Sequence, residues 1–125
     1  MKHDIQISED IQLMVDTFYN KVKADDLLGP IFENVVQGDW TKHLKKMYNF
    51  WETVLLNVHK YTGSPFQKHI PLPIEAMHFE RWLSLFHATV DDLFQGEKAE
   101  EVKKRSSQMG MMFQYKLEHI RGTSQ

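Results

Sequence analysis

The residue of this sequence with the clearest chemical potential is His69, at the end of the segment 63–69, Gly-Ser-Pro-Phe-Gln-Lys-His. Ser64 and Pro65 predict the N-cap and the first position of a helix, because Pro there gives up only an N–H group that has no partner. Pro71 follows and stops the helix at once. One helical turn is unstable by itself, and a neutral imidazole bound to a metal would hold it. The alternative is a loop histidine that faces solvent.

A second histidine, His43, lies on the apolar face of a predicted helix, one turn before Met47. A buried neutral histidine in such a place is most often only hydrogen-bonded within the core, so His43 alone indicates no function. The sequence has no zinc-protease, P-loop or serine-hydrolase motif. Charged, loop or terminal neighbours predict surface positions for the other histidines: His3, His59, His78, His87 and His119.

The composition narrows the class of protein. A chain of 125 residues predicts one domain, 1–125. The absence of cysteine excludes disulfides, iron–sulfur clusters, thiolate-ligated haem and thiol catalysis. A net charge of −2 argues against nucleic-acid partners. No apolar run approaches the ~20 residues of a membrane span, and the polar start Met1-Lys2-His3-Asp4 is unlike a secretory signal. We therefore expect no membrane contact and a cytoplasmic location.

Gly and Pro divide the chain into segments of helical periodicity, and no segment alternates like a strand, so the sequence predicts an all-α fold. A helix capped by Ser8 is expected to end near residues 25–26, and a short turn is expected to begin at Pro30. Further helices are expected to follow Asp39, to run from about residue 75 to the cap Gly96, and to cover 97–122.

The last of these helices carries two expectations of its own. The pairs Glu100–Lys104 and Glu101–Arg105 have the favourable i,i+4 orientation. An apolar stripe predicts its buried side, namely Val102, Met109, Met112, Phe113, Leu117 and Ile120.

Aromatic side chains are concentrated on the predicted inner faces and beside the His69 turn. They are Tyr19, Phe32, Phe50, Trp51, Phe66, Phe79 and Trp82. Such a stripe is usually core and nothing more. Together with two histidines in four short helices, however, these rings would suit a flat apolar macrocycle with one axial imidazole.

Several motifs occur in order over about seventy residues. The first are Phe18-Tyr19, Leu28-Gly29-Pro30-Ile31-Phe32, His43 four residues before Met47, and Asn49-Phe50-Trp51. They continue with Tyr61-x-Gly63-x-Pro65, Lys68-His69-x-x-Leu72-Pro73 and Phe79-x-x-Trp82-Leu83-x-x-Phe86. Through this ordered set the chain resembles the truncated haemoglobins over essentially its whole length. Because the paired-glycine turns of the other two groups are missing, it resembles the third group.

The resemblance implies a two-over-two helical sandwich, a shortened globin that encloses haem b (iron protoporphyrin IX). It implies that His69 is the proximal ligand of the iron and that the distal side is lined by Tyr19, His43 and Trp82. The remaining pocket residues that it implies are Phe32, Met47, Phe50, Trp51, Phe66 and Phe79. Lys46 and Lys68 would reach the haem propionates, with an ordinary solvated lysine as the alternative for each.

The implied function is binding of O₂, NO, CO or peroxide. Tyr19 and Trp82 are donors that would stabilise the partial negative charge of bound O₂, so slow O₂ release and a role in NO or peroxide detoxification are expected. His43 would donate to the ligand or move as a gate, without binding the iron. An NO dioxygenase-like or peroxidase-like enzyme would need a reductase, which the sequence does not identify. We expect a monomer. The alternatives are a non-catalytic O₂ sensor or reservoir, and a haem-free helical interaction module.

Overall fold

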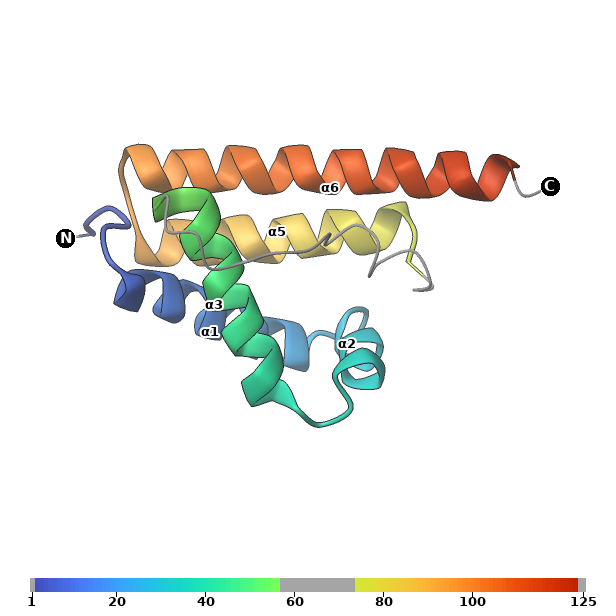
Figure 1. The fold of residues 1–125 in the computed structure, drawn as a ribbon, viewed down its shortest axis with the longest axis horizontal. Coiled ribbons are helices and arrows are strands. Elements are labelled where there is room, and N and C mark those ends of the chain that lie inside the picture. Colours follow the sequence, from blue (N-terminus) through green and yellow to red (C-terminus); the bar gives the residue numbers. More distant parts are fainter. Residues whose placement is uncertain (1, 57–73, 124–125) are drawn as a thin grey trace.

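Two helical pairs packed on each other make up the structure (Figure 1). It is a computed structural model that describes residues 2–56 and 74–123. Within these ranges the elements are α1 (Ser8–Ala24), α2 (Gly29–Val36), α3 (Trp40–Leu56), α5 (Ala76–Leu93) and α6 (Glu97–Thr123). The described residues contain no strand, which agrees with the predicted all-α class. None of the helices in this part of the chain has the length and apolar content that crossing a membrane requires.

Helix α1 buries the stripe that its sequence predicts. Met14, Phe18 and Val22 are each at most 1% exposed, because their three-four spacing puts them on one face. The predicted cap is wrong. Ile7 occupies the N-cap position, and the Asp10 carboxylate accepts the N–H groups of Gln6 and Ile7 at 2.9 and 3.2 Å. Ser8, whose hydroxyl donates to buried Glu52, is already helical.

The segment after α1 is a second correction, because the turn expected at Pro30 is the eight-residue helix α2. Its start is organised by Asp25, whose carboxylate accepts the N–H groups of Leu27 and Leu28 at 3.1 and 2.9 Å. Pro30 falls in the first turn, where a missing N–H group costs nothing. A Cβ atom on Gly29 would lie 3.0 Å from a carbonyl oxygen of α1, so glycine permits this close approach.

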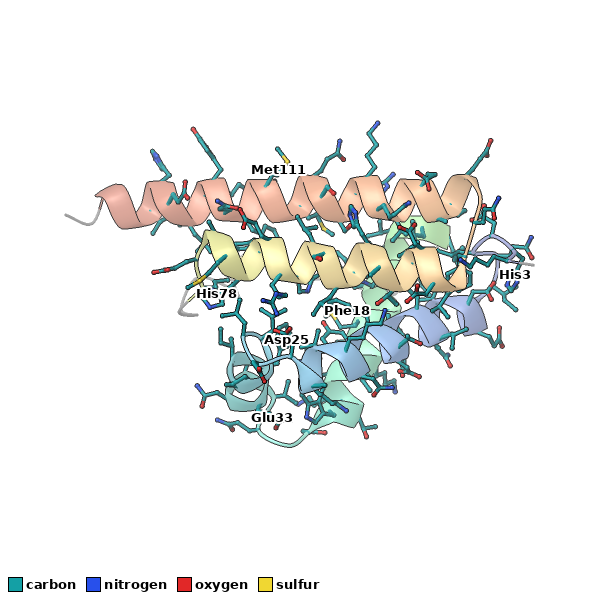
Figure 2. The ribbon with its side chains drawn as sticks, turned by 180° about the vertical axis from the view of Figure 1, so that it is seen from behind. His3, Phe18, Asp25, Glu33, His78 and Met111 are labelled. Carbon is teal, nitrogen blue, oxygen red and sulfur yellow. The ribbon has the colours of Figure 1, made fainter. Side chains whose placement is uncertain are left out.

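Asp25 also joins this junction to α5, because Arg81 Nη1 lies 2.6 Å from its Oδ1 (Figure 2). Burial alone raises the pKa of Asp25, but the Leu28 N–H group and the Arg81 guanidinium outweigh burial and hold the pKa below 3.8. Because the folded pKa is the lower one, ionised Asp25 stabilises the fold above pH 3.8. This stability is lost as the pH falls through the folded pKa.

Replacing Asp25 with Asn should therefore lower the free energy of unfolding at neutral pH by about 1.5–3 kcal/mol, the contribution of hydrogen bonds to a charged group. Urea denaturation at neutral and acid pH measures it. The difference between wild type and Asp25→Asn should shrink below pH 3.8, whereas the exposed neighbour, in Asp26→Asn, should show almost none. An equal difference at both pH values would assign the effect to shape and not to charge.

The remaining helices begin at caps, some of which are distant in the sequence. Asp39 caps α3 as predicted, since its Oδ1 accepts the Lys42 N–H group at 3.3 Å. Asp4 caps α6 from the other end of the chain and accepts the N–H groups of Lys98 and Ala99, each at 2.9 Å. A Cβ atom on Gly96, whose φ is +140°, would lie 2.6 Å from Asp4 Cγ. Gly96 thus makes room for the α6 cap and does not end α5, whose C-cap is Phe94.

In helix α6, some of the predictions from the local sequence pattern are wrong. The Glu101–Arg105 pair forms as predicted at 2.9 Å, but Glu100 pairs with Lys103 at 2.9 Å in place of Lys104. Met112 and Ile120 were expected to be buried and are 44% and 38% exposed. Helix α6 has 27 residues and its partner α5 has 18. It therefore extends beyond the start of α5 (Figure 1).

The core between the two layers is largely aromatic. The Phe86 ring stacks with two indoles, and its centroid lies 5.2 Å from those of both Trp51 and Trp82. Phe18 meets Phe86 edge-on at 5.1 Å and Trp82 edge-on at 5.5 Å. Stacked and edge-to-face rings are the preferred aromatic geometries, so this cluster fixes the positions of α1, α3 and α5 relative to one another.

Candidate functional site

A cavity of about 550 Å³ lies between the helices, lined by side chains of α1, α2, α3, α5 and α6. Nine of the predicted pocket residues border it, namely Tyr19, Phe32, His43, Lys46, Met47, Phe50, Trp51, Phe79 and Trp82. The other three, Phe66, Lys68 and His69, lie outside the described residues. The structure therefore brings together the nine predicted residues that it describes, and their roles toward a cofactor stay a prediction.

Tyr19 lies on α1 and is 5% exposed. Burial raises the pKa of the Tyr19 phenol well above its ordinary value of 10.0, because a buried phenolate would lose its hydration. The phenol therefore keeps its proton at physiological pH and can act as a donor. Its ring meets His43 edge-on at 5.0 Å and Phe32 edge-on at 5.7 Å.

Trp82 borders the cavity from α5 and is half-buried. Its ring is almost parallel to that of Phe86 and stacks with it, with an interplanar angle of 2°, and Phe18 meets it edge-on. Phe18 also contacts Tyr19, with centroids 4.9 Å apart. The Phe18 ring therefore contacts both the Tyr19 phenol ring and the Trp82 indole, and this packing restrains both donor side chains.

His43 borders the cavity from α3 and is half-buried. Three rings surround its imidazole edge-on, with centroid distances of 5.0 Å to Tyr19, 6.0 Å to Trp40 and 6.2 Å to Phe32. The location agrees with the apolar face predicted for it. A role in gating or donation stays a prediction.

His78 borders the cavity, although its charged and loop neighbours in the sequence predicted a surface position. It lies four residues before Trp82 on α5, and this i,i+4 spacing was the signal that could have found it. Its Nδ1 accepts the Glu75 N–H group at 2.8 Å. In the neutral ring the proton is then on Nε2, so His78 is a donor and not a metal ligand while this bond is present.

Two lysines border the cavity from α3 and are exposed, Lys46, which was predicted, and Lys42, which was not. They stand one helical turn apart, so both ammonium groups follow one edge of the helix. Carboxylates of a bound molecule would find cations there. Other lining residues missed from sequence come from α1, from α2 and the segments on either side of it, from the segment before α5, and from α6: Phe18, Leu28, Ile31, Val35, Val36, Gln37, Asp39, Ile74, Met109, Gly110 and Phe113.

The cavity fits the haem that the resemblance implies. Its volume is within the roughly 300–1,000 Å³ of cofactor and small-molecule sites, and aromatic and aliphatic side chains make up most of its wall. The exposed cations Lys42 and Lys46 would match two propionates at one edge. A flat apolar ring with carboxylates on one side would suit the apolar wall and the two ammonium groups.

Comparison with known proteins gives a consistent result. The bacterial-like globin family model matches residues 4–115. Group 3 truncated hemoglobin ctb of Campylobacter jejuni is 34% identical over 121 residues, which cover 94% of this chain and 95% of that protein. The crystal structure of a group III truncated hemoglobin from Campylobacter jejuni superposes with a TM-score of 0.88, at 34% identity over 94% of this chain and 95% of that one.

Two further solved structures are similar at 28% identity. The truncated oxygen-avid haemoglobin of Bacillus subtilis superposes with a TM-score of 0.76 and covers 86% of this chain and 92% of that one. The group II truncated hemoglobin of Bacillus anthracis superposes with a TM-score of 0.74 and covers 85% of this chain and 83% of that one.

These matches extend from the segment before α1 into α6, and they confirm both the resemblance and the predicted two-over-two globin fold. Membership implies haem and a small ligand at the iron, which agrees with the wall of the cavity. The chain belongs to the bacterial-like globins, as a truncated haemoglobin of the third group.

Proposed function

We propose that this globin is a cytoplasmic haem b protein that holds O₂ tightly and uses it to remove NO, with peroxide as a second oxidant that it can consume. One observation carries the proposal. A buried neutral phenol, Tyr19, and an indole, Trp82, border the same apolar cavity. Both can donate a hydrogen bond to a ligand atom that gains negative charge, and a low dielectric strengthens such bonds.

Haem, when bound, supplies an iron atom with one position open to a diatomic ligand or peroxide. In the proposal His69 holds the iron from the proximal side, and Lys46 and Lys68 neutralise the propionates. The apolar wall of Phe32, Phe50 and the other lining side chains excludes water. His43 would move protons, since an imidazole gains and loses a proton near neutral pH.

Two donors on one ligand slow its release, which serves transport poorly and favours redox chemistry. NO plus O₂ plus one electron gives nitrate, so each turnover requires an electron from outside. The proposal therefore includes an as yet unidentified reductase.

The test begins with haem titration of the purified chain, which should produce a Soret band that shifts on reduction and on addition of CO. The ferrous protein saturated with O₂ is then mixed with NO by stopped flow. We expect one nitrate per haem and immediate conversion to the ferric spectrum. Slow or absent nitrate formation with a normal CO spectrum would favour an O₂ sensor or reservoir. Absence of a Soret band would favour a haem-free interaction module.

A further inference from the structure

Trp40, the first residue of α3, connects the cavity wall to the surface. It is half-buried and does not itself line the cavity. Its ring centroid lies 6.0 Å from that of Tyr19 and 6.0 Å from that of His43, and both of those rings border the cavity. An oxidisable indole is thus one ring contact away from two cavity side chains and still reaches solvent.

Two charged side chains beside Trp40, those of Glu33 and Lys23, favour loss of its Nε1 proton when the ring is oxidised. Trp40 Nε1 donates to Glu33 Oε1 at 2.9 Å, and Glu33 is an exposed residue of α2 (Figure 2). Lys23 Nζ lies 4.4 Å from the Trp40 ring centroid. The ammonium stabilises the neutral ring through its π face and disfavours a positively charged one. Oxidation of Trp40 by one electron is therefore favourable only if the Nε1 proton moves to Glu33.

The neighbouring Tyr19 has the opposite surroundings. It is 5% exposed, inside the aromatic wall, where separated charge is costly. Tyr19 can pass an electron, but a proton leaves Trp40 more easily because a carboxylate already accepts its N–H group. The structure thus gives a direction, from solvent-facing Trp40 through the Tyr19 and His43 rings to the cavity.

We propose that Trp40 is a surface oxidation site, through which phenolic one-electron donors too large for the cavity reduce peroxide. The proposal rests on peroxide consumption under the proposed function. Trp40 gives one electron toward the cavity and its Nε1 proton to Glu33, and exposed Glu33 releases this proton to solvent. A phenol, ArOH, then returns a hydrogen atom to Trp40 and leaves as ArO•. Peroxide takes up one proton from solvent with each electron, so two such cycles balance as H₂O₂ + 2 ArOH → 2 H₂O + 2 ArO•, with peroxide reduced and the phenol oxidised.

The experiment locates the radical directly. Haem-loaded protein is mixed with H₂O₂ and a nitroso spin trap, and the adduct is mapped by mass spectrometry. We expect the adduct on Trp40 in wild type and its loss in Trp40→Phe. Glu33→Gln keeps a hydrogen-bond acceptor but cannot take the proton, so it should also lose the adduct while the fold is unchanged. Tyr115→Phe, at a side chain that is 71% exposed on α6, is the matched surface control and should keep it.

Two phenolic electron donors of different size distinguish oxidation at the surface from oxidation in the cavity. Tyramine coupled to dextran cannot enter the cavity, whereas free phenol can. Trp40→Phe should lose oxidation of the dextran conjugate and keep that of phenol. An adduct elsewhere in wild type, or oxidation of the conjugate by Trp40→Phe at the wild-type rate, would overturn the proposal while leaving peroxide consumption standing. If neither the wild type nor any of the variants consumed peroxide, the proposed peroxide reaction would be wrong, and this proposal would be wrong with it.

Discussion

In a His69→Ala variant we expect the five-coordinate ferrous spectrum and the iron–histidine Raman stretch to disappear. The chain has no cysteine that could replace the imidazole. Among the described residues, the histidines that border the cavity are His43 and His78. His78 Nδ1 already accepts the Glu75 N–H group, and His43 stands beside Tyr19, on the side assigned to the ligand.

Imidazole added to His69→Ala should restore a haem spectrum, since it can occupy the space left by the side chain. His78→Gln is the matched control, because it removes a cavity histidine that is not expected to bind iron, and its Raman stretch should be that of wild type. If His69→Ala kept the same stretch, another residue would be the ligand, and the resemblance would have misplaced the proximal side.

The sequence predicts an element well when the spacing of apolar residues within that element determines its structure. Phe18 and Val22 are buried because their spacing makes one face of α1 apolar whatever packs against it. Helix α2 was missed because its start depends on Asp25, which precedes it, and on contact with α1. Met112 was misplaced because a periodic stripe does not tell where the partner helix ends.

The cavity residues also divide into those that a local sequence pattern predicts and those that depend on contacts between helices. The predicted side chains that line it belong to helices whose inner faces are readable, and a family resemblance supplied their roles. His78 and Lys42 were missed although each stands four residues from a predicted residue, Trp82 or Lys46, which is an i,i+4 signal. Phe113 was recognised as buried but not as cavity-lining, because only the packing of α6 against the other helices decides between the two.

O₂ release is expected to accelerate by about ten- to a hundred-fold when Trp82 is replaced with Phe. A hydrogen bond to a partly charged acceptor contributes roughly 1.5–3 kcal/mol, and each 1.4 kcal/mol is a factor of about ten. Phenylalanine keeps an aromatic ring against Phe86, and it removes the N–H group together with part of the indole volume. CO carries little negative charge when bound, so its release should change much less. Stopped-flow dissociation of both ligands measures the difference.

The alternative is that the Trp82 ring only fills volume, and Trp51→Phe supplies the matched control for it. Trp51 also stacks on Phe86 and borders the cavity, so its replacement removes the same indole volume from the same cluster. If Trp51→Phe and Trp82→Phe changed O₂ release equally, Trp82 would be a packing residue. Tyr19→Phe should accelerate O₂ release as Trp82→Phe does. Because both donors would act on one ligand atom, the double variant should depart from the sum of the two single effects, whereas two packing defects that relax separately would add.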